Sequence, residues 1–502
     1  MPTTFEVATK TALPVRAEPD PRRFRALGVI AIAQLMIVLD ASVVTIALPS
    51  AQRALHISIA NRQWVLTAYT LAFGGLLLIG GRIADFVGRK RMFIISLLGF
   101  AAASALGGLA QDPAMLFGAR ALQGAFAAVM APASLSLLTV TFTEPRERAK
   151  AFGVYGAVAG GGAAIGLVLG GALTEYSWRW TLLINVPIAI IAALGALREV
   201  KESRAEGQRR YDIWGALAIT AGLLALVYGF TRAESDGWAS PVTLSLLSAG
   251  IVLLSAFVLV ERYSATPLLP LRVVLDRNRG GSFLASLLVG ISLTGTFLFL
   301  TYYFQGTLHY SALKCGFAFL PFSGGIIVSA MLASQLLPRL GPRRLMSSGL
   351  SLAALGLAWF TGIGLHTSYV AHVLPAEIVV SVGLGFAFVP FSSTALIGVA
   401  RHDAGVASAL VNATQQVGGS LGTALLNTVA ASATAGYLVT HHGRLAADLA
   451  PVHGYTTGFI CSALVLFAAM LVAVGMVRAS RAELPGGGTG DMVATEVLVG
   501  VG

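Results

Sequence analysis

The chain has 502 residues, of which 56% are hydrophobic and only 11% are charged, and its mean hydropathy is +0.78. Soluble domains carry about 25% charged residues, so this composition excludes a soluble globular protein and indicates an integral membrane protein. The net charge of +11 does not indicate nucleic-acid binding, because no basic face with interleaved aromatic residues stands apart from the apolar segments.

Fourteen apolar segments are long enough to cross a bilayer. Most have roughly 18 to 25 residues, the length at which a helix spans a hydrocarbon core of about 30 Å. In chain order the predicted spans are 26–48, 64–81, 92–110, 115–138, 153–174, 181–198, 212–231, 242–261, 281–303, 315–337, 345–364, 372–395, 405–430 and 456–477. They predict an all-α membrane protein and not a barrel, whose strands are about half as long.

The basic residues predict the orientation of the chain. With an even number of spans, both termini lie on one side, and the tails and loops of that side carry 27 Lys and Arg residues. The other side has 6, namely Arg53, Arg62, Arg179, Arg232, Lys314 and Arg444. Because basic loops stay in the cytoplasm, we expect a multi-pass membrane protein with both termini cytoplasmic. The tail over 1–25 has no apolar core, so it is not a signal peptide.

Asp40, Arg120 and Glu377 are charged residues that lie within predicted spans and away from the span ends, where a charge is costly and indicates a functional site. Asp40 in the first span and Arg120 in the fourth fall at similar depth toward the exterior. We therefore expect them to pair in a central cavity and to couple to protons, with a purely structural ion pair as the alternative. Glu377, early in the twelfth span, is expected either to bind a proton or cation or to be a merely hydrated group near the exterior end.

The loop between the second and third spans has a distinctive pattern. It reads Gly81–Arg82–Ile83–Ala84–Asp85–Phe86–Val87–Gly88–Arg89–Lys90–Arg91, and a weaker echo over 340–344 follows the tenth span. Because a similar loop with glycine and arginine residues occurs in both halves of the chain, the sequence predicts a transporter built from two duplicated halves. The expected organisation is a tail over 1–25, a six-helix bundle over 26–198, charged loops with two inserted helices over 199–280, a second six-helix bundle over 281–477, and a flexible cytoplasmic tail over 478–502.

These residues resemble the major facilitator superfamily, and in particular its fourteen-helix drug:proton antiporter family. The hairpin matches the signature of that superfamily at Gly81, Asp85, Gly88, Arg89 and Lys90. The resemblance implies a gating role for the hairpin, while orientation by positive charge alone is the plainer alternative. It also implies a location in the bacterial inner membrane and proton-driven export of a hydrophobic or cationic drug or antibiotic by alternating access.

The fifth span carries four glycines that are similar to the antiporter motif of this family, namely Gly162, Gly166, Gly170 and Gly171. In that motif a proline follows the second glycine, whereas this chain has Leu167. Glycines alone also serve close helix packing. Leu167 therefore leaves open an exporter or proton symporter of another small metabolite, such as an amino acid, a siderophore or a lipid.

Substrate is expected between the two bundles, near the middle of the membrane. The candidate wall consists of aromatic and amide side chains, namely Gln63, Trp64, Tyr69, Tyr302, Tyr303, Gln305, Asn412 and Gln416. Aromatic faces suit flat or cationic organic molecules. Aromatic residues near span ends also form interfacial belts, which is the alternative for Trp64, Tyr302 and Tyr303.

The sequence contains no pattern typical of an enzyme. We recognise no metal-ligand cluster, no phosphate-binding loop and no nucleophile in a strand-to-helix turn, so we expect no catalytic activity, cofactor or metal. The expected partners are a small-molecule substrate, protons and the lipid bilayer, and the chain is expected to be a monomer. A non-transporting receptor on the same fold is the alternative from another class, but it would not need an ionisable pair at membrane depth.

Overall fold

A computed structural model describes residues 21–58, 61–142, 144–204, 212–264, 269, 271–399 and 404–479. Within these ranges the chain is helical and forms no strand. Each of the fourteen predicted spans coincides with a helical segment, which confirms the fold class. Most of the N-terminal tail, nearly all of the C-terminal tail and the loop over 205–211 lie outside the described residues.

The N-terminal half contains the first six spans. They are α1 (Arg23–Ala54), α2 (Trp64–Val87), α3 (Arg89–Gly108), α4 (Pro113–Thr141), α5 (Pro145–Tyr176) and a sixth span formed by α6 (Trp180–Leu183) and α7 (Asn185–Glu199). Local sequence fixes several helix starts. The Asp112 carboxylate accepts a hydrogen bond from the Met115 amide at 2.9 Å, and Pro113 follows at the first position of α4. A capping carboxylate and an early proline are both typical of a helix start.

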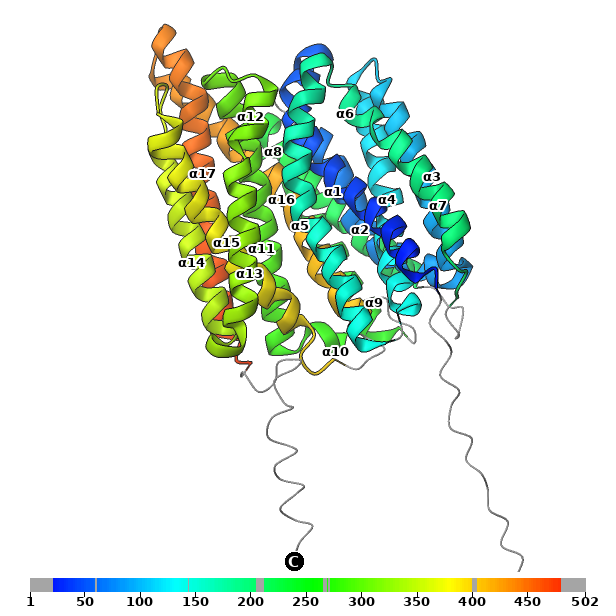
Figure 1. Cartoon of the computed structure of the whole chain (residues 1–502). Coiled ribbons are helices and arrows are strands. Elements are labelled where there is room, and N and C mark those ends of the chain that lie inside the picture. The colour runs from blue at the N-terminus through cyan, green and yellow to red at the C-terminus, as the bar shows by residue number, and fades with distance from the viewer. Residues whose placement is uncertain are drawn as a thin grey trace, which may run out of the picture.

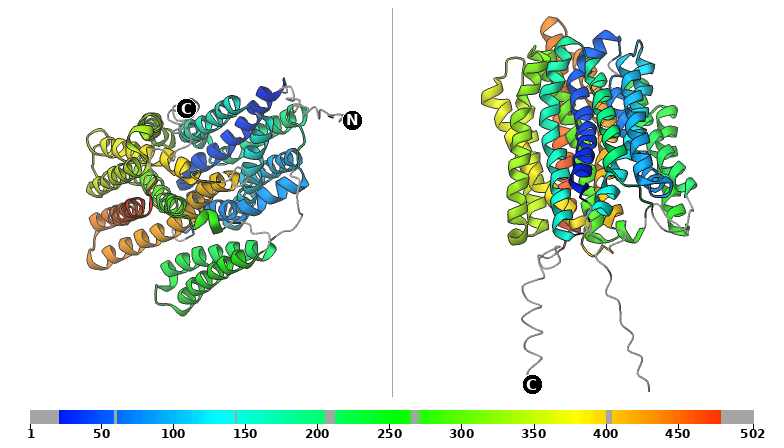
Figure 2. Two further views of the ribbon diagram at one scale, coloured as in Figure 1. Left: turned by 90° about the horizontal axis from the view of Figure 1, so that it is seen from below. Right: turned by 45° about the vertical axis from the view of Figure 1, so that its right-hand side comes forward.

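Two inserted helices separate the halves, α8 (Ile213–Asp236) and α9 (Pro241–Tyr263), and a short α10 (Leu271–Val274) follows them. They lie as a pair at the edge of the molecule (Figure 2). The α8 helix packs against both α2 and α16, so it bridges the two halves, whereas α9 packs mainly on α8. The outer side of α9 exposes apolar residues such as Ile251 and Val252, as expected for a surface that faces lipid.

The C-terminal half contains the last six spans. The first is α11 (Arg277–Tyr302), which ends in the π-helical turn η1 (Tyr303–Thr307), and the second is α12 (Ala312–Ala318) with α13 (Leu320–Leu340). Next come α14 (Pro342–Trp359) with its terminal turn η2 (Phe360–Gly362), η3 (Tyr369–Val373) with α15 (Leu374–Ala395), α16 (Ala404–Thr440) and α17 (Arg444–Met476).

The lengths and compositions of the helices agree with a membrane protein. Of the described segments, 11 are long and apolar enough to cross a membrane, or 12 if the two parts of α2 form one span. The long helices α5 and α16 coincide with the other two predicted spans. The 37 residues of α16 correspond to about 55 Å, so this helix extends beyond a hydrocarbon core of about 30 Å.

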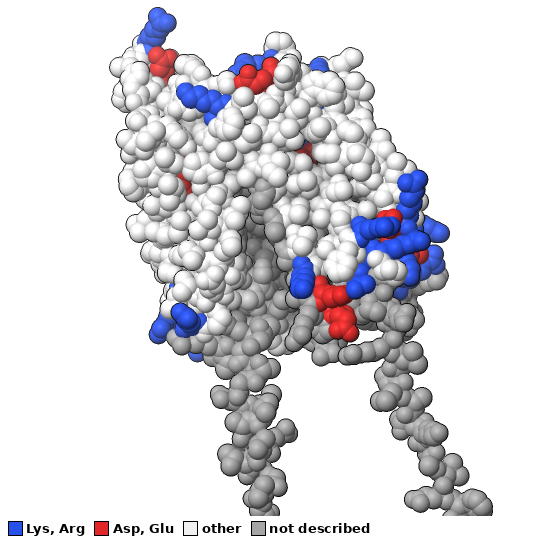
Figure 3. Space-filling view, in the orientation of Figure 1, with Lys and Arg blue, Asp and Glu red and all other residues white. Residues whose placement is uncertain are grey.

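The two halves stand side by side with their helices roughly parallel (Figure 1). The first residue of α1 and the last residue of α17 lie at the same end of the molecule, here called the termini face, and the opposite end is the distal face. The halves meet through α5 with α12 and α13, and through α2 with α16. The surface is hollowed between them toward the termini face (Figure 3).

Candidate functional site

The structure brings Asp40 and Arg120 together inside the N-terminal half. Asp40 of α1 is 0% exposed and Arg120 of α4 is 1% exposed. The Arg120 Nη1 atom donates a hydrogen bond to Asp40 Oδ2 at 2.6 Å. Two opposite charges that are removed from water are stable only when they pair closely and satisfy their remaining hydrogen bonds, and this pair meets that condition.

Two amide side chains complete the surroundings of the Asp40 carboxylate. Gln123 Nε2 of α4 and Asn185 Nδ2 of α7 donate to Asp40 Oδ1 at 2.9 and 2.8 Å. Asp40 thus accepts hydrogen bonds from three side chains on two other helices, and it donates none. This geometry fits an ionised carboxylate, which can only accept. Charge-assisted hydrogen bonds of this kind hold α1 against α4 and α7.

Further contacts fix Arg120 and Gln123 in place. Arg120 Nε donates to the Val65 carbonyl of α2 at 2.9 Å, and the guanidinium lies 4.5 Å from the centre of the Tyr69 ring. Arg120 Nη1 also donates to Gln123 Oε1 at 2.8 Å, and Gln123 Nε2 donates to Ser104 Oγ of α3 at 2.7 Å. The cluster therefore joins five helices of one half.

Some hydrogen-bonding capacity beside Asp40 is unused. Within the described residues, the Asn185 Oδ1 and Tyr69 Oη atoms are buried and have no hydrogen-bond partner. A buried polar atom without a partner costs free energy and is a place where a water molecule or a proton gains interactions. These two atoms are thus the places beside Asp40 where a further hydrogen bond can form.

The position expected for the Asp40–Arg120 pair needs a correction. We expected the pair to line a central cavity between the halves, but both side chains are buried inside the N-terminal half. The reason is that all their hydrogen-bond partners come from helices of that half, which close around the pair.

The alternative of a hydrated Glu377 near the membrane surface is wrong. Glu377 in α15 is 0% exposed. Its Oε2 lies 3.4 Å from the hydroxyl of Tyr369, which also donates to the Ala318 carbonyl at 2.7 Å, so η3 lies over the carboxyl. The Glu377 Oε1 atom has no hydrogen-bond partner among the described residues. Glu377 is therefore a second buried carboxyl, in the other half of the molecule.

The glycines of α5 form two packing surfaces. A Cβ added to Gly162, Gly166 or Gly170 would lie 3.1, 2.8 or 2.8 Å from atoms of α1. A Cβ added to Gly171 would lie 2.6 Å from the Ala312 carbonyl oxygen in α12, across the boundary between the halves. These glycines let α5 approach α1 and the C-terminal half closely. Near Gly171, Gly316 of α12 packs in the same way against the backbone of Leu167.

The hairpin between α2 and α3 contains the expected ion pair, with Arg89 Nε 2.7 Å from Asp85 Oδ1. Gly88 has a φ of +130°, a conformation that favours glycine, and an added Cβ would lie 2.9 Å from the Glu202 carboxylate. That carboxylate accepts hydrogen bonds from the backbone amides of Lys90 and Arg91, both at 3.1 Å, and so caps the start of α3.

The rest of the hairpin also contacts its own half. Lys90 Nζ donates to the Leu197 carbonyl of α7 at 2.8 Å, and Gly81 packs against Pro132 of α4. The partners that the structure describes for Gly81, Asp85, Gly88, Arg89 and Lys90 lie in the N-terminal half or in the segment directly after α7, which contains Glu202 and Ser203. The hairpin does not join the two halves through these partners in this conformation.

The eight residues expected to form one substrate wall do not come together. Gln63 Nε2 donates to Thr231 Oγ1 of the inserted α8 at 3.1 Å, and Trp64 lies against Tyr228 of the same helix. The position of the inserted helices explains the error for Gln63 and Trp64.

The other six residues are divided between several places. Tyr69 belongs to the Arg120 cluster, and Tyr303 donates to the Gly364 carbonyl within the C-terminal half. Tyr302 and Gln305 contact α1. Asn412 is exposed, and Gln416 lies beside Gly74 of α2.

Sequence reasoning assigned no role to Gln123, Asn185 or Arg62. The two amides carry a usable signal, because each is a strong hydrogen-bonding group inside or at the start of an apolar span. Arg62 is a cation on the side of the membrane where basic residues are scarce.

The sequence of this chain is similar to one family profile and to several characterised proteins. The sequence profile described as Major Facilitator Superfamily matches residues 30–423. The chain is 54% identical to the puromycin resistance protein of Streptomyces alboniger, over 89% of this chain and 90% of that protein. It is 40% identical to a cephamycin export protein of Amycolatopsis lactamdurans, over 83% and 88% of the two chains. It is 33% identical to the lincomycin resistance protein of Streptomyces lincolnensis, over 84% and 87%.

Solved structures with the same fold are more distant in sequence. A bacterial homologue of the human lysosomal transporter Spinster, in an inward-facing and occupied conformation, superposes with a TM-score of 0.65 at 14% identity. The match covers 93% of this chain and 99% of that one. A peptide transporter described as auto-inhibited gives a TM-score of 0.64 at 18% identity, over 91% and 97%.

Proposed function

Because this chain belongs to the major facilitator superfamily and is a drug-efflux transporter of that superfamily, we propose that proton entry drives the efflux and that Asp40 binds the proton. The observation that carries the proposal is the buried Asp40 carboxylate, which accepts hydrogen bonds from Arg120, Gln123 and Asn185. It is an ionisable group at membrane depth whose contacts determine the packing of several helices.

Protonation of Asp40 has a direct effect on these contacts. In a neutral carboxyl the hydrogen bonds from Gln123 and Asn185 lose their charge assistance, the bond from the Arg120 guanidinium becomes weaker, and the new O–H needs an acceptor. The unpartnered Asn185 Oδ1 nearby is an acceptor of that kind. Binding of a proton therefore weakens the attachment of α1 to α4 and α7, and it gives the proton a way to change the arrangement of the helices.

The energy available from protons is sufficient for export. One charge that moves inward across a potential of 100 mV releases about 2.3 kcal/mol. For a neutral substrate this free energy corresponds to a gradient of roughly fiftyfold, because each 1.4 kcal/mol is tenfold. When one proton exchanges for one drug cation, no net charge crosses the membrane, and the pH gradient alone drives the export.

We propose the bacterial inner membrane as the location, with the termini face in the cytoplasm. In that orientation the hollow between the halves opens to the cytoplasm, where a drug would enter (Figure 3). The hairpin around Asp85 would then lie at the cytoplasmic end, where we propose that it gates access. The buried carboxyl of Glu377 is proposed as a second proton or cation site.

For the substrate, we propose an antibiotic of the puromycin type, on the basis of the 54% identical puromycin resistance protein. Puromycin combines an amino group with aromatic rings, in line with a hydrophobic or cationic drug.

The test compares two modes of puromycin movement in vesicles that contain wild type, Asp40→Asn or Asp448→Asn. The last variant is a matched control, because Asp448 is an exposed carboxylate in α17. We expect Asp40→Asn to retain substrate exchange at equal concentrations and to lose uphill transport driven by a pH gradient. Uphill transport by Asp40→Asn at the wild-type rate would contradict the role of Asp40, and the absence of both modes in wild type would contradict the substrate.

A further inference from the structure

Arg62 differs from the other basic residues predicted on its side of the membrane. Of these six residues, only Arg62 is buried, with 8% of its surface exposed. Arg53, Lys314 and Arg444, for example, are exposed. It lies immediately before α2, near the distal face. Burial of an arginine is costly unless its donors find partners, so its partners indicate what this residue does.

The partners of Arg62 lie in the other half of the molecule. Its Nε and Nη2 atoms donate to Asn427 Oδ1 of α16 at 3.3 and 3.2 Å. Its guanidinium carbon lies 3.9 Å from the centre of the Tyr302 ring at the end of α11. The Tyr302 hydroxyl in turn donates to Gln52 Oε1 of α1 at 2.7 Å. The cluster therefore links two residues of the N-terminal half, Arg62 and Gln52, to two residues of the C-terminal half, Tyr302 and Asn427.

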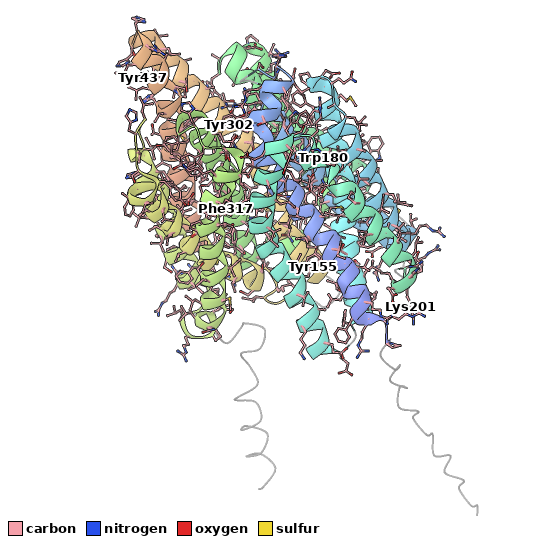
Figure 4. The ribbon with its side chains drawn as sticks, turned by 45° about the horizontal axis from the view of Figure 1, so that its top comes forward. Tyr155, Trp180, Lys201, Tyr302, Phe317 and Tyr437 are labelled. Atoms are coloured by element: carbon pink, nitrogen blue, oxygen red, sulfur yellow. The ribbon has the colours of Figure 1, made fainter. Side chains whose placement is uncertain are left out.

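These contacts are on the closed side of the molecule. Two other side-chain hydrogen bonds between the halves are described, from Gln305 Nε2 to the Ile46 carbonyl at 2.9 Å and from the Leu313 amide to Glu175 Oε1 at 3.3 Å. Both also lie toward the distal face. Figure 4 shows Tyr302 beside α1 at that end, and Figure 3 shows the hollow at the other.

The chemistry of the cluster suits a contact that opens and closes. Arg62 is held by an amide oxygen and an aromatic face, and none of the partners described for it is a carboxylate. When the contact breaks, no buried anion is left without a partner, and water can hydrate the guanidinium from the distal side. An ion pair at this position would be harder to separate, because both charges would lose their partner.

We infer that Arg62, Tyr302, Asn427 and Gln52 form a distal latch, which holds the distal face closed and must break before the transporter can open to that side. In this assignment Tyr302 is a gate residue and not part of the substrate wall. The inference goes beyond the proposed proton chemistry at Asp40, and its test needs neither substrate nor protons.

The test measures distances between pairs of spin labels in the full-length protein in lipid nanodiscs, with Cys315 and Cys461 replaced by alanine. One label pair, Tyr176→Cys with Leu445→Cys, spans the distal face at exposed positions, 88% and 65%. A second pair, Arg91→Cys with Arg343→Cys, spans the termini face at exposed positions. Arg62→Ala is compared with Arg53→Ala, whose arginine contacts Ser50 of its own helix at 3.2 Å.

In Arg62→Ala we expect the fraction of long distances between the two labels on the distal face to at least double, and the distances between the two labels on the termini face to shorten. In Arg53→Ala both distance distributions should match those of wild type. Tyr302→Phe keeps the ring and should shift the distances less than Tyr302→Leu. If Arg62→Ala does not fold, Tyr302→Leu decides the question on its own. Distance distributions in a folded Arg62→Ala or Tyr302→Leu variant that match those of Arg53→Ala would overturn the latch.

Discussion

At the scale of single residues, Asp40 and Arg120 form a fully buried ion pair, with 2.6 Å between Arg120 Nη1 and Asp40 Oδ2. Both residues stand out in the sequence because each places a charge inside an apolar span. Two opposite charges at membrane depth are stable only when they pair closely. The hydrogen bonds from Gln123 and Asn185 could not be predicted, because they depend on the rotation of α4 and α7 about their axes. The same limitation applies to Arg62, whose partners lie 240 and 365 positions away in the chain.

The Asp40–Arg120 pair makes a prediction about stability. Arg120→Gln leaves a buried carboxylate without its cation, which costs roughly 3–5 kcal/mol in buried pairs. We expect a large fall in the melting temperature of the purified protein. The double variant Asp40→Asn with Arg120→Gln removes both charges and should recover most of the loss without recovering proton-driven transport.

The matched control is the partly buried pair of Asp85 and Arg89, whose side chains are 30% and 15% exposed, and there Arg89→Gln should cost about 1 kcal/mol or less. A double variant at Asp40 and Arg120 that melts no higher than Arg120→Gln alone would show that the two residues are not coupled.

At the scale of helices, apolar length and glycine spacing predicted where the spans run but not which surfaces meet. Gly162, Gly166 and Gly170 face α1, whereas Gly171, one position further, faces the other half. A one-residue step rotates a helical position by about 100°, so neighbouring glycines reach different helices. The π-helical turn over Tyr303–Thr307, which contains Gln305, also has no clear sequence signal.

Gly171→Ala tests the contact between α5 and α12. Alanine favours a helix over glycine by about 0.5–1 kcal/mol, so any harmful effect must come from the added Cβ, which would lie 2.6 Å from the Ala312 carbonyl oxygen. We expect longer distances across the distal face and at least a tenfold slower export. Gly324→Ala is the control, because its Cβ would meet no atom within 4 Å. Equal transport by the two variants would contradict a tight contact at Gly171.

The ends of α1 and α5 at the termini face give a prediction of pH dependence. Arg23 Nε donates to Glu147 Oε2 at 2.8 Å. This hydrogen bond, together with the charges of Arg23 and Lys150, holds the pKa of Glu147 below its ordinary value of 4.5. A lowered pKa in the folded state means that the stabilisation is present above the ordinary value and disappears as the pH falls through the lowered one.

We therefore expect wild type to melt higher than Glu147→Gln at pH 7, and the difference to vanish as the pH falls from about 5 toward 3. Glu144→Gln removes a neighbouring exposed carboxylate and should show no such trend. A difference between wild type and Glu147→Gln that does not change with pH would mean that the ion pair is not its source.

At the scale of the whole molecule, the two buried carboxyls lie in different halves, Asp40 in the first and Glu377 in the second. The hairpin and its echo over 340–344 predict a plan of two duplicated halves. They do not predict the position of the inserted helices, and because α8 bridges α2 and α16, it occupies space that we had assigned to substrate at Gln63 and Trp64. Hydropathy predicts that an inserted pair exists but carries no information on the edge at which it packs.

The central claim is that drug export is coupled to a proton at Asp40. The most direct test records the lumenal pH of liposomes that contain the purified protein while puromycin is added, for wild type, Asp40→Glu and Asp40→Asn. We predict proton movement that depends on the drug in wild type, a reduced response in Asp40→Glu and none in Asp40→Asn. Proton movement of equal size in wild type and in folded Asp40→Asn would contradict the account.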